Sequence, residues 1–205
     1  MKALVIIIKL LLIVNFTTAQ WSNKFLGSKQ EHYLYANGGL VAGDVKGGEL
    51  GISFVYKKKY SIQFGYSATE KTTVSPPSDF LKSAGEQISP MSGNSFENME
   101  NFHVTVGRII ELSKRKKLRL NIQGGGGISN VREPSDWYWC ASDDYGLNYN
   151  CETAKKQELS IVINPKFEFP LSPMIGVTFG PTAILAKEKS FYGFGAGIIY
   201  GCVWQ

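Results

Sequence analysis

The two residues spaced like a catalytic pair are His103 and Thr105, which are separated by one valine. Alternate residues of a β-strand point to the same face, and an imidazole beside a hydroxyl is the minimal arrangement for a base-activated nucleophile. No carboxylate that would orient the imidazole is evident, and the second histidine, His32, lies at the opposite end of the predicted strands. His103 and Thr105 are therefore the catalytic candidates, but we expect a protein that is not an enzyme.

Further polar residues share the strand face that holds His103. They carry both signs of charge. Because an unpaired buried charge is costly, we expect them to form ion pairs and hydrogen bonds in a filled interior; the alternative is a path for protons or ions. The predicted network consists of His103, Glu111, Arg119, Asn121, Gln123, Glu158, Lys166 and Glu168.

Two of the three cysteines, Cys140 and Cys151, lie in one long polar segment. An exported segment meets an oxidising environment, so we predict a disulfide between them. No histidine is near enough to suggest a metal site, and no cofactor is predicted. The third cysteine, Cys202, falls on an apolar row that we expect to face lipid, where it would act as a small apolar residue.

The same polar segment is rich in aromatic residues, which would form a binding surface for an extracellular protein or a glycan. The alternative is a segment that packs on itself and caps the mouth of the fold. The aromatic residues of this predicted surface are Trp137, Tyr138, Trp139, Tyr145 and Tyr149.

The start of the chain has the three parts of a secretory signal peptide. Lys2 gives the basic start, residues 3–14 are mostly apolar, and Ala19 and the threonine two positions before it are small residues at the expected cleavage site. The alternative, an uncleaved membrane anchor, needs about 20 apolar residues. We predict that residues 1–19 are removed and that residues 20–30 form a short periplasmic leader.

The rest of the chain alternates apolar with polar or glycine residues, and this period of two indicates strands. In segment 190–204 one face is apolar and aromatic from Tyr192 to Trp204, and the other is mostly glycine. A nearly bare face suits a crowded interior, so we predict a closed barrel with its apolar face toward lipid. The eight predicted strands are 33–41, 49–56, 60–69, 101–112, 117–129, 157–169, 173–185 and 190–204.

The connections between the predicted strands give the barrel a direction. Those after the second, fourth and sixth strands are short, whereas segments 70–100 and 130–156 are long. Outer-membrane barrels have short periplasmic turns and long outer loops, so the two long segments should lie outside the cell. Aromatic residues near both ends of the predicted strands match the aromatic girdles of such barrels.

Three details of register follow from the same pattern. Tyr33 and Tyr35 begin an outward row in the first strand, and Gly38 and Gly39 are the expected site of a bulge. Arg108 interrupts an apolar row, so it either extends its charge to the membrane surface or marks a second bulge.

The composition bounds the class of protein. The chain of 205 residues suits one domain, and its charged fraction of 19% is below the globular average of about 25%. Without Lys2 and Lys9 of the predicted signal peptide, the net charge of +5 becomes +3, from 20 basic and 17 acidic residues. This charge is too mild to indicate nucleic acid, and the basic residues form no stripe with interleaved aromatics. After residue 20 no apolar stretch is long enough for a spanning helix, so a membrane crossing would use strands.

The signal peptide, the glycine-rich alternating strands and the aromatic-rich last strand resemble the small outer-membrane β-barrel family of Gram-negative bacteria, which includes OmpA and OmpX. The resemblance covers residues 31–204, within a predicted barrel domain of residues 31–205. It implies an all-β, eight-stranded antiparallel up-and-down transmembrane β-barrel of porin-like class in the outer membrane, a monomer in contact with outer-membrane lipids and lipopolysaccharide. One departure is that Gln205 follows Trp204, whereas the last strand in the family usually ends on an aromatic residue.

Three functions stay open on these grounds. We expect a structural or adhesion-type binding role through the outer segments. The second is an enzyme of outer-leaflet lipid, because lipid A deacylases, which also have eight strands, use a similar His-x-Ser pair. The third is a secreted, lipocalin-like barrel, which would need an apolar interior and a polar exterior; the polar rows of segments 117–129 and 157–169 argue against it.

Overall fold

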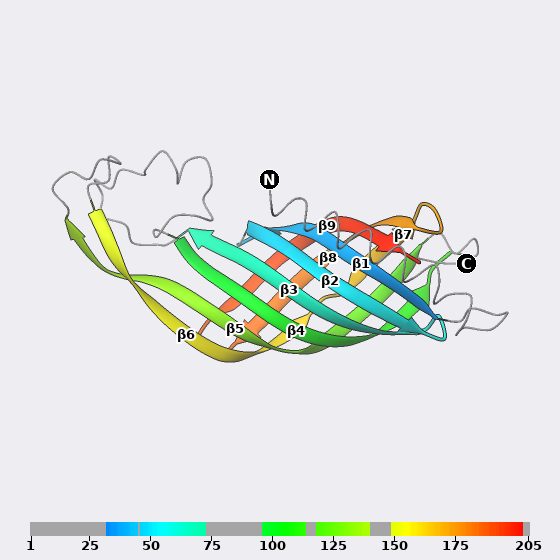
Figure 1. Cartoon of the computed structure of the whole chain (residues 1–205), viewed down its shortest axis with the longest axis horizontal. Helices are drawn as coiled ribbons and strands as arrows, with labels where there is room; N and C mark the ends of the chain where they lie inside the picture. The colour runs from blue at the N-terminus through cyan, green and yellow to red at the C-terminus, as the bar shows by residue number, and fades with distance from the viewer. Residues whose placement is uncertain (1–31, 45, 73–95, 114–117, 140–148, 203–205) are drawn as a thin grey trace, which may run out of the picture.

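The computed structural model describes residues 32–44, 46–72, 96–113, 118–139 and 149–202. These residues form nine strands (Figure 1). The strands are β1 Tyr33–Gly43, β2 Lys46–Tyr56, β3 Tyr60–Thr72, β4 Phe96–Glu111, β5 Arg119–Trp139, β6 Tyr149–Ile163, β7 Lys166–Pro170, β8 Ile175–Ala186 and β9 Ser190–Gly201. The predicted signal peptide and leader lie outside the described residues.

The strands close into one antiparallel barrel. Consecutive strands pair with each other, except β6 with β7, and β1 pairs with β9, so no edge is left open. Strands β6 and β7 together fill one position between β5 and β8, because the strand is interrupted at Asn164 and Pro165. The predicted eight-stranded up-and-down barrel is confirmed, with one of its eight positions built from two shorter strands.

The apolar row of each strand faces outward. The exposed fractions of Leu159, Ile161 and Phe194 are 79%, 59% and 54%, whereas those of Arg119 and Lys166 are 4% and 5%. In water this arrangement would be unfavourable, since burial of apolar surface is the main force that favours folding. The lipocalin-like alternative required the opposite arrangement and is wrong. Among the described residues, no helix is long and apolar enough to cross a membrane.

Several strands run further than predicted at the end of the barrel that carries the long connections, the end that we expect to lie outside the cell. Strands β3 and β4 remain paired as far as Thr72 and Phe96, and β5 and β6 as far as Trp139 and Tyr149. In Figure 1 the hairpin of β5 and β6 reaches well beyond the other strands. The predicted loops 70–100 and 130–156 were therefore too long, because alternation of apolar residues is lost once neither face of a strand touches lipid.

The register of β1 also differs from the prediction. Tyr33 and Tyr35 are buried inside the barrel, with exposed fractions of 5% and 3%, and do not face lipid. The pairing of β1 with β2 runs without a shift past Gly38 and Gly39, so the expected bulge is absent there. The ladder of β4 is likewise continuous through Arg108, whose side chain is exposed on the outer face.

Apolar clusters close the interior toward both ends. The plug near the short turns, which we call the periplasmic plug after the expected orientation, consists of Tyr33, Tyr35, Val55, Ile109 and Ile199. Cys202 packs against it instead of facing lipid as predicted. Toward the other end, the outer plug consists of Val41, Met99, Val131, Val162, Ile184 and Phe191. Along β4 the buried Asn101, His103 and Thr105 lie between the two plugs, because Met99 belongs to the outer plug and Ile109 to the periplasmic plug.

Candidate functional site

The polar centre of the barrel is organised around Glu168 of β7. Its carboxylate accepts hydrogen bonds from Arg119 Nη2 at 2.6 Å, Asn121 Nδ2 at 2.9 Å and the Tyr35 hydroxyl at 2.9 Å. Alternation along β7 places Lys166 and Glu168 inside, with the two phenylalanines of that strand facing out. Glu168 is thus a buried charge with both an ion pair and additional hydrogen bonds, which is the condition under which such a charge is tolerated.

Hydrogen bonds extend this cluster across the barrel. Asn121 Oδ1 accepts a hydrogen bond from Ser61 at 2.8 Å, and Gln123 lies within 3.4 Å of both Ser61 and Thr105. Lys166 forms an ion pair with Glu49 of β2. The sequence prediction missed Glu49, although it shares the inner row of its strand, because it stands at the predicted strand boundary.

His103 and Thr105 lie inside the closed barrel, with exposed fractions of 8% and 1%. His103 Nδ1 is 2.7 Å from Asn101 Oδ1, and the Thr105 hydroxyl donates to Gln123. Neither hydrogen bond joins the imidazole to the hydroxyl or to a carboxylate. The described residues also contain no group of three histidine, cysteine or acidic side chains arranged for a metal ion.

Two members of the predicted network lie away from the polar centre. Glu111 is exposed at the last residue of β4. Glu158 is half-buried near the outer rim, where it accepts a hydrogen bond of 3.0 Å from the backbone N–H of Glu188. The structure therefore brings together six of the predicted residues in the buried interior, namely His103, Arg119, Asn121, Gln123, Lys166 and Glu168.

The interior is filled at this level. A cavity of about 10 Å³ is lined by residues that include Tyr35, Asn37, Lys166 and Thr178. That volume is close to the minimum that holds one water molecule. The buried Asn37 Oδ1 and Thr178 Oγ1 have no hydrogen-bond partner in the described residues, and both face this space.

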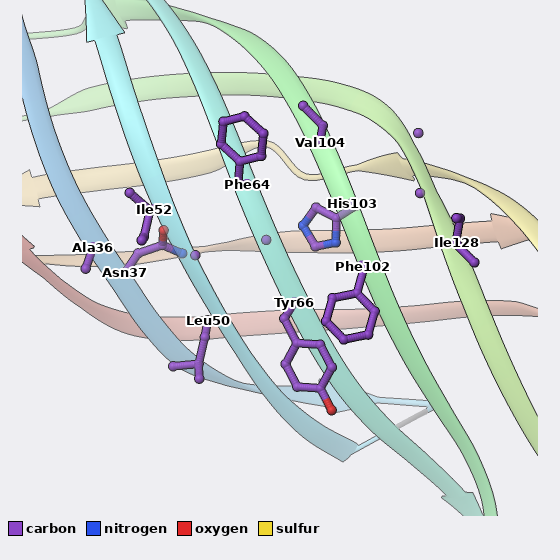
Figure 2. Close-up of a pocket in the computed structure, with 14 residues that line it drawn as sticks. Ala36, Asn37, Leu50, Ile52, Phe64, Tyr66, Phe102, His103, Val104 and Ile128 are labelled. Carbon is purple, nitrogen blue, oxygen red and sulfur yellow. The ribbon is translucent and has the colours of Figure 1, made fainter. Parts of the chain in front are cut away.

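A shallow hollow of about 670 Å³ lies across β1 to β5 on the outer face. Figure 2 shows it bordered by Leu50, Phe64, Tyr66 and Phe102. The rings of Tyr66 and Phe102 are adjacent, with centroids 4.7 Å apart. Leu50, Phe64 and Phe102 belong to the exposed apolar surface, and Tyr66 is half-buried beside them, so the hollow is part of the lipid-facing belt.

The outer hairpin of β5 and β6 is braced by ion pairs. Lys189, just before β9, lies 2.7 Å from Glu133 and 3.2 Å from Glu97. Lys156 lies 2.5 Å from Glu188. The hydrogen bond from Lys156 lowers the pKa of the Glu188 carboxyl, and the same bond raises the pKa of the Lys156 ammonium group. We call Lys156, Glu188, Lys189 and Glu133 the rim clamp.

The predicted binding surface lies at the far end of this hairpin. Its backbone pairs are Trp137 with Cys151, Tyr138 with Asn150 and Trp139 with Tyr149, after a bulge between Ser135 and Trp137. Tyr145 and Cys140 lie outside the described residues, so the disulfide stays a prediction.

Comparison with known proteins bears on the fold. No protein-family model matches the chain, and no curated protein matches it in sequence. Among solved structures, a major outer membrane protein of Thermus thermophilus aligns with a TM-score of 0.57 at 9% identity, over 83% of this chain and 99% of that one. The chain has the fold of a small outer-membrane β-barrel.

Two further solved structures align with this outer-membrane barrel. They are Ail, the attachment invasion locus protein of Yersinia pestis, and the N-terminal β-barrel domain of Pseudomonas aeruginosa OprF. Their TM-scores are 0.48 and 0.44 at 9% and 12% identity, and each alignment covers 83% of this chain and 97% of the other. An apolar exterior and a polar interior are the arrangement found in outer-membrane barrels. The protein therefore lies in an outer membrane.

Proposed function

We propose that this barrel has a structural and surface-binding role, in which the far end of the β5–β6 hairpin contacts a protein or glycan outside the cell. The observation that carries the proposal is that strand pairing continues to Trp139 and Tyr149, far past the lipid-facing belt. A strand of this length exceeds what a membrane crossing requires, because a transmembrane strand needs about 9–11 residues and β5 has 21.

The rim clamp supports the proposal, because it holds the base of the hairpin. A binding segment that is ordered before it meets its partner loses less conformational entropy on association. Tryptophan and tyrosine dominate the energetics of protein interfaces, and four of them occupy the last paired positions of the hairpin, at Trp137, Tyr138, Trp139 and Tyr149.

The geometry of His103 and Thr105 supports a role other than catalysis. Both side chains are buried in the interior, and the plugs lie between them and the two mouths of the barrel. An outer-leaflet lipid would have to pass the barrel wall to reach the Thr105 hydroxyl. The lipid A deacylase alternative is therefore disfavoured on access alone.

The test is binding by the barrel in lipid nanodiscs to a glycan array and to purified extracellular-matrix proteins. We expect replacement of residues 136–150 by a short Asn-Gly turn to reduce the strongest binding signal by at least about tenfold, the effect of losing one hot-spot residue or more. The matched control shortens segment 76–92 and should keep the signal. Binding that survives the hairpin deletion, or no binding by the unaltered barrel, would contradict the proposal.

A further inference from the structure

The turn between β2 and β3 has an unusual backbone. Lys57 and Lys58 have φ values of 50° and 59°, and in the described part of the chain they are the two non-glycine residues with positive φ. A tight hairpin turn with this backbone favours Asn-Gly, because a side chain disfavours the left-handed region. Residues that disfavour their own backbone conformation are concentrated where the side chain has a function. The two lysines of this turn are therefore candidates for a functional role.

The first two lysines of the turn lie over different tyrosine rings, one exposed and one buried in the periplasmic plug. Lys57 Nζ lies 5.3 Å from the centroid of the Tyr56 ring, and Lys58 Nζ lies 5.8 Å from that of Tyr33. Lys59 is exposed, and so is Arg108, which neighbours Lys59 across the sheet as the pairing partner of Tyr60. We call Lys57, Lys58, Lys59 and Arg108 the basic collar.

The basic collar lies at the edge of the apolar belt. The exposed side chains next to it include Phe54, Tyr56, Tyr60, Ile62 and Val106. The surface thus changes from apolar through tyrosine to cationic within a few residues. Tyrosine marks the membrane interface, so the collar lies at the depth of lipid headgroups, on the side of the short periplasmic turns.

Within the described part of the chain, three of the four collar residues lack the acidic partners that the lysines of the opposite rim have. Lys57, Lys59 and Arg108 form no ion pair among the described residues, whereas Lys156 and Lys189 at the outer rim each pair with glutamates. Among the described residues at this end of the barrel, Glu111 is the exposed acidic residue. Cationic side chains at headgroup depth attract anionic lipid, and each additional charge near the surface strengthens that attraction.

We propose that the basic collar binds the headgroups of anionic phospholipids in the periplasmic leaflet and thereby fixes the depth of the barrel at that interface. The ligand is an acidic phospholipid of the phosphatidylglycerol class, recognised through its phosphate charge. This inference does not depend on what the outer hairpin binds.

The test uses a variant that removes charge without harming the turn. K57N/K58G loses two cations and gains the residues that this backbone prefers, so its thermal stability in neutral detergent should stay equal or rise. Native mass spectrometry of the full chain from mixed phosphatidylglycerol and phosphatidylcholine nanodiscs would measure retained lipid. We expect unaltered protein to prefer phosphatidylglycerol by about fivefold or more, the effect of about one lysine near an anionic surface.

The preference should fall toward equality in K57N/K58G and in K59Q/R108Q. The matched control K155Q/K187Q removes two charges at the other rim and should keep the preference. No preference in the unaltered protein, equal loss in the control, or full preference in K57N/K58G would overturn the proposal. Capture of the unaltered protein by isolated peptidoglycan, without phospholipid preference, would overturn it in favour of a cell-wall site.

Discussion

Glycine residues in the interior make room for polar side chains from neighbouring strands. His103 of β4 pairs with Gly65 of β3 on one side and Gly127 of β5 on the other. A Cβ on Gly65 would overlap the His103 imidazole, whose ring Figure 2 shows beside β3. A Cβ on Gly107 would lie 2.7 Å from Ser61 Oγ and 2.6 Å from Gln123 Cγ. The glycine row is therefore required by the network that crosses it.

Gly65→Ala should destabilise the barrel by about 1–3 kcal/mol, the usual range for overpacking a filled core. Urea unfolding in lipid vesicles would measure the free energy of unfolding. The penalty should shrink in a His103→Ala background, because the ring that meets the new methyl group is gone. Gly126→Ala is the matched control: its nearest heavy atom, Ser160 O, is 3.7 Å away. An equal cost for both alanines would contradict the explanation.

The outer hairpin and the β8–β9 turn form one element held by charge. Glu188 has a lowered pKa, so its contribution is present above its ordinary pKa of 4.5 and is lost as pH falls through the lower folded value. Lys156 has a raised pKa, so its contribution is present below 10.5 and is lost as pH rises through the higher folded value. The Lys156–Glu188 contact is thus intact across neutral pH, with Glu133, Glu158, Lys187 and Lys189 as the other charges around it.

Acidification well below pH 4.5 should release the β8–β9 turn. The backbone order parameter of Glu188, measured by NMR in bicelles, should fall from about 0.85 near neutral pH to below about 0.6 in acid. Glu188→Gln should show the low value already at neutral pH, since it cannot pair with Lys156 as an ion. Lys155→Gln removes a nearby charge outside the contact and should leave the neutral value unchanged. A turn that stays ordered in acid would count against the clamp.

Sequence reasoning worked where lipid imposes a period of two and failed where it does not. The eight strand positions and the inner places of Arg119 and Glu168 follow from that alternation. The inward orientation of the Tyr35 side chain could not be predicted from the alternation, because an amphipathic tyrosine fits either face of a strand. Its hydrogen bond to Glu168 inside the barrel decides between the two faces. Beyond the belt the sequence of β5 and β6 no longer alternates apolar with polar residues, so their outer parts could not be distinguished from loops.

At the scale of the whole molecule, two apolar plugs enclose a polar centre, and an apolar belt surrounds both. Each buried charge at the centre has a partner, as Arg119 with Glu168 and Lys166 with Glu49 show. The belt is the reverse of a soluble surface, since residues such as Leu50 and Phe64 are each 63% exposed. Only a hydrocarbon environment makes that arrangement stable, because the strands carry their own hydrogen bonds within a closed sheet.

The most direct test places a nitroxide spin label at Ile161 and, separately, at Phe194, in a chain whose native cysteines are replaced by serine. Electron paramagnetic resonance of the reconstituted protein then compares collisions with oxygen, which concentrates in hydrocarbon, and with a water-soluble nickel chelate. A label at Arg132, beyond the belt, serves as the aqueous control. We predict that oxygen dominates at positions 161 and 194 and that the chelate dominates at 132. Dominance of the chelate at 161 and 194 would contradict the membrane-spanning barrel.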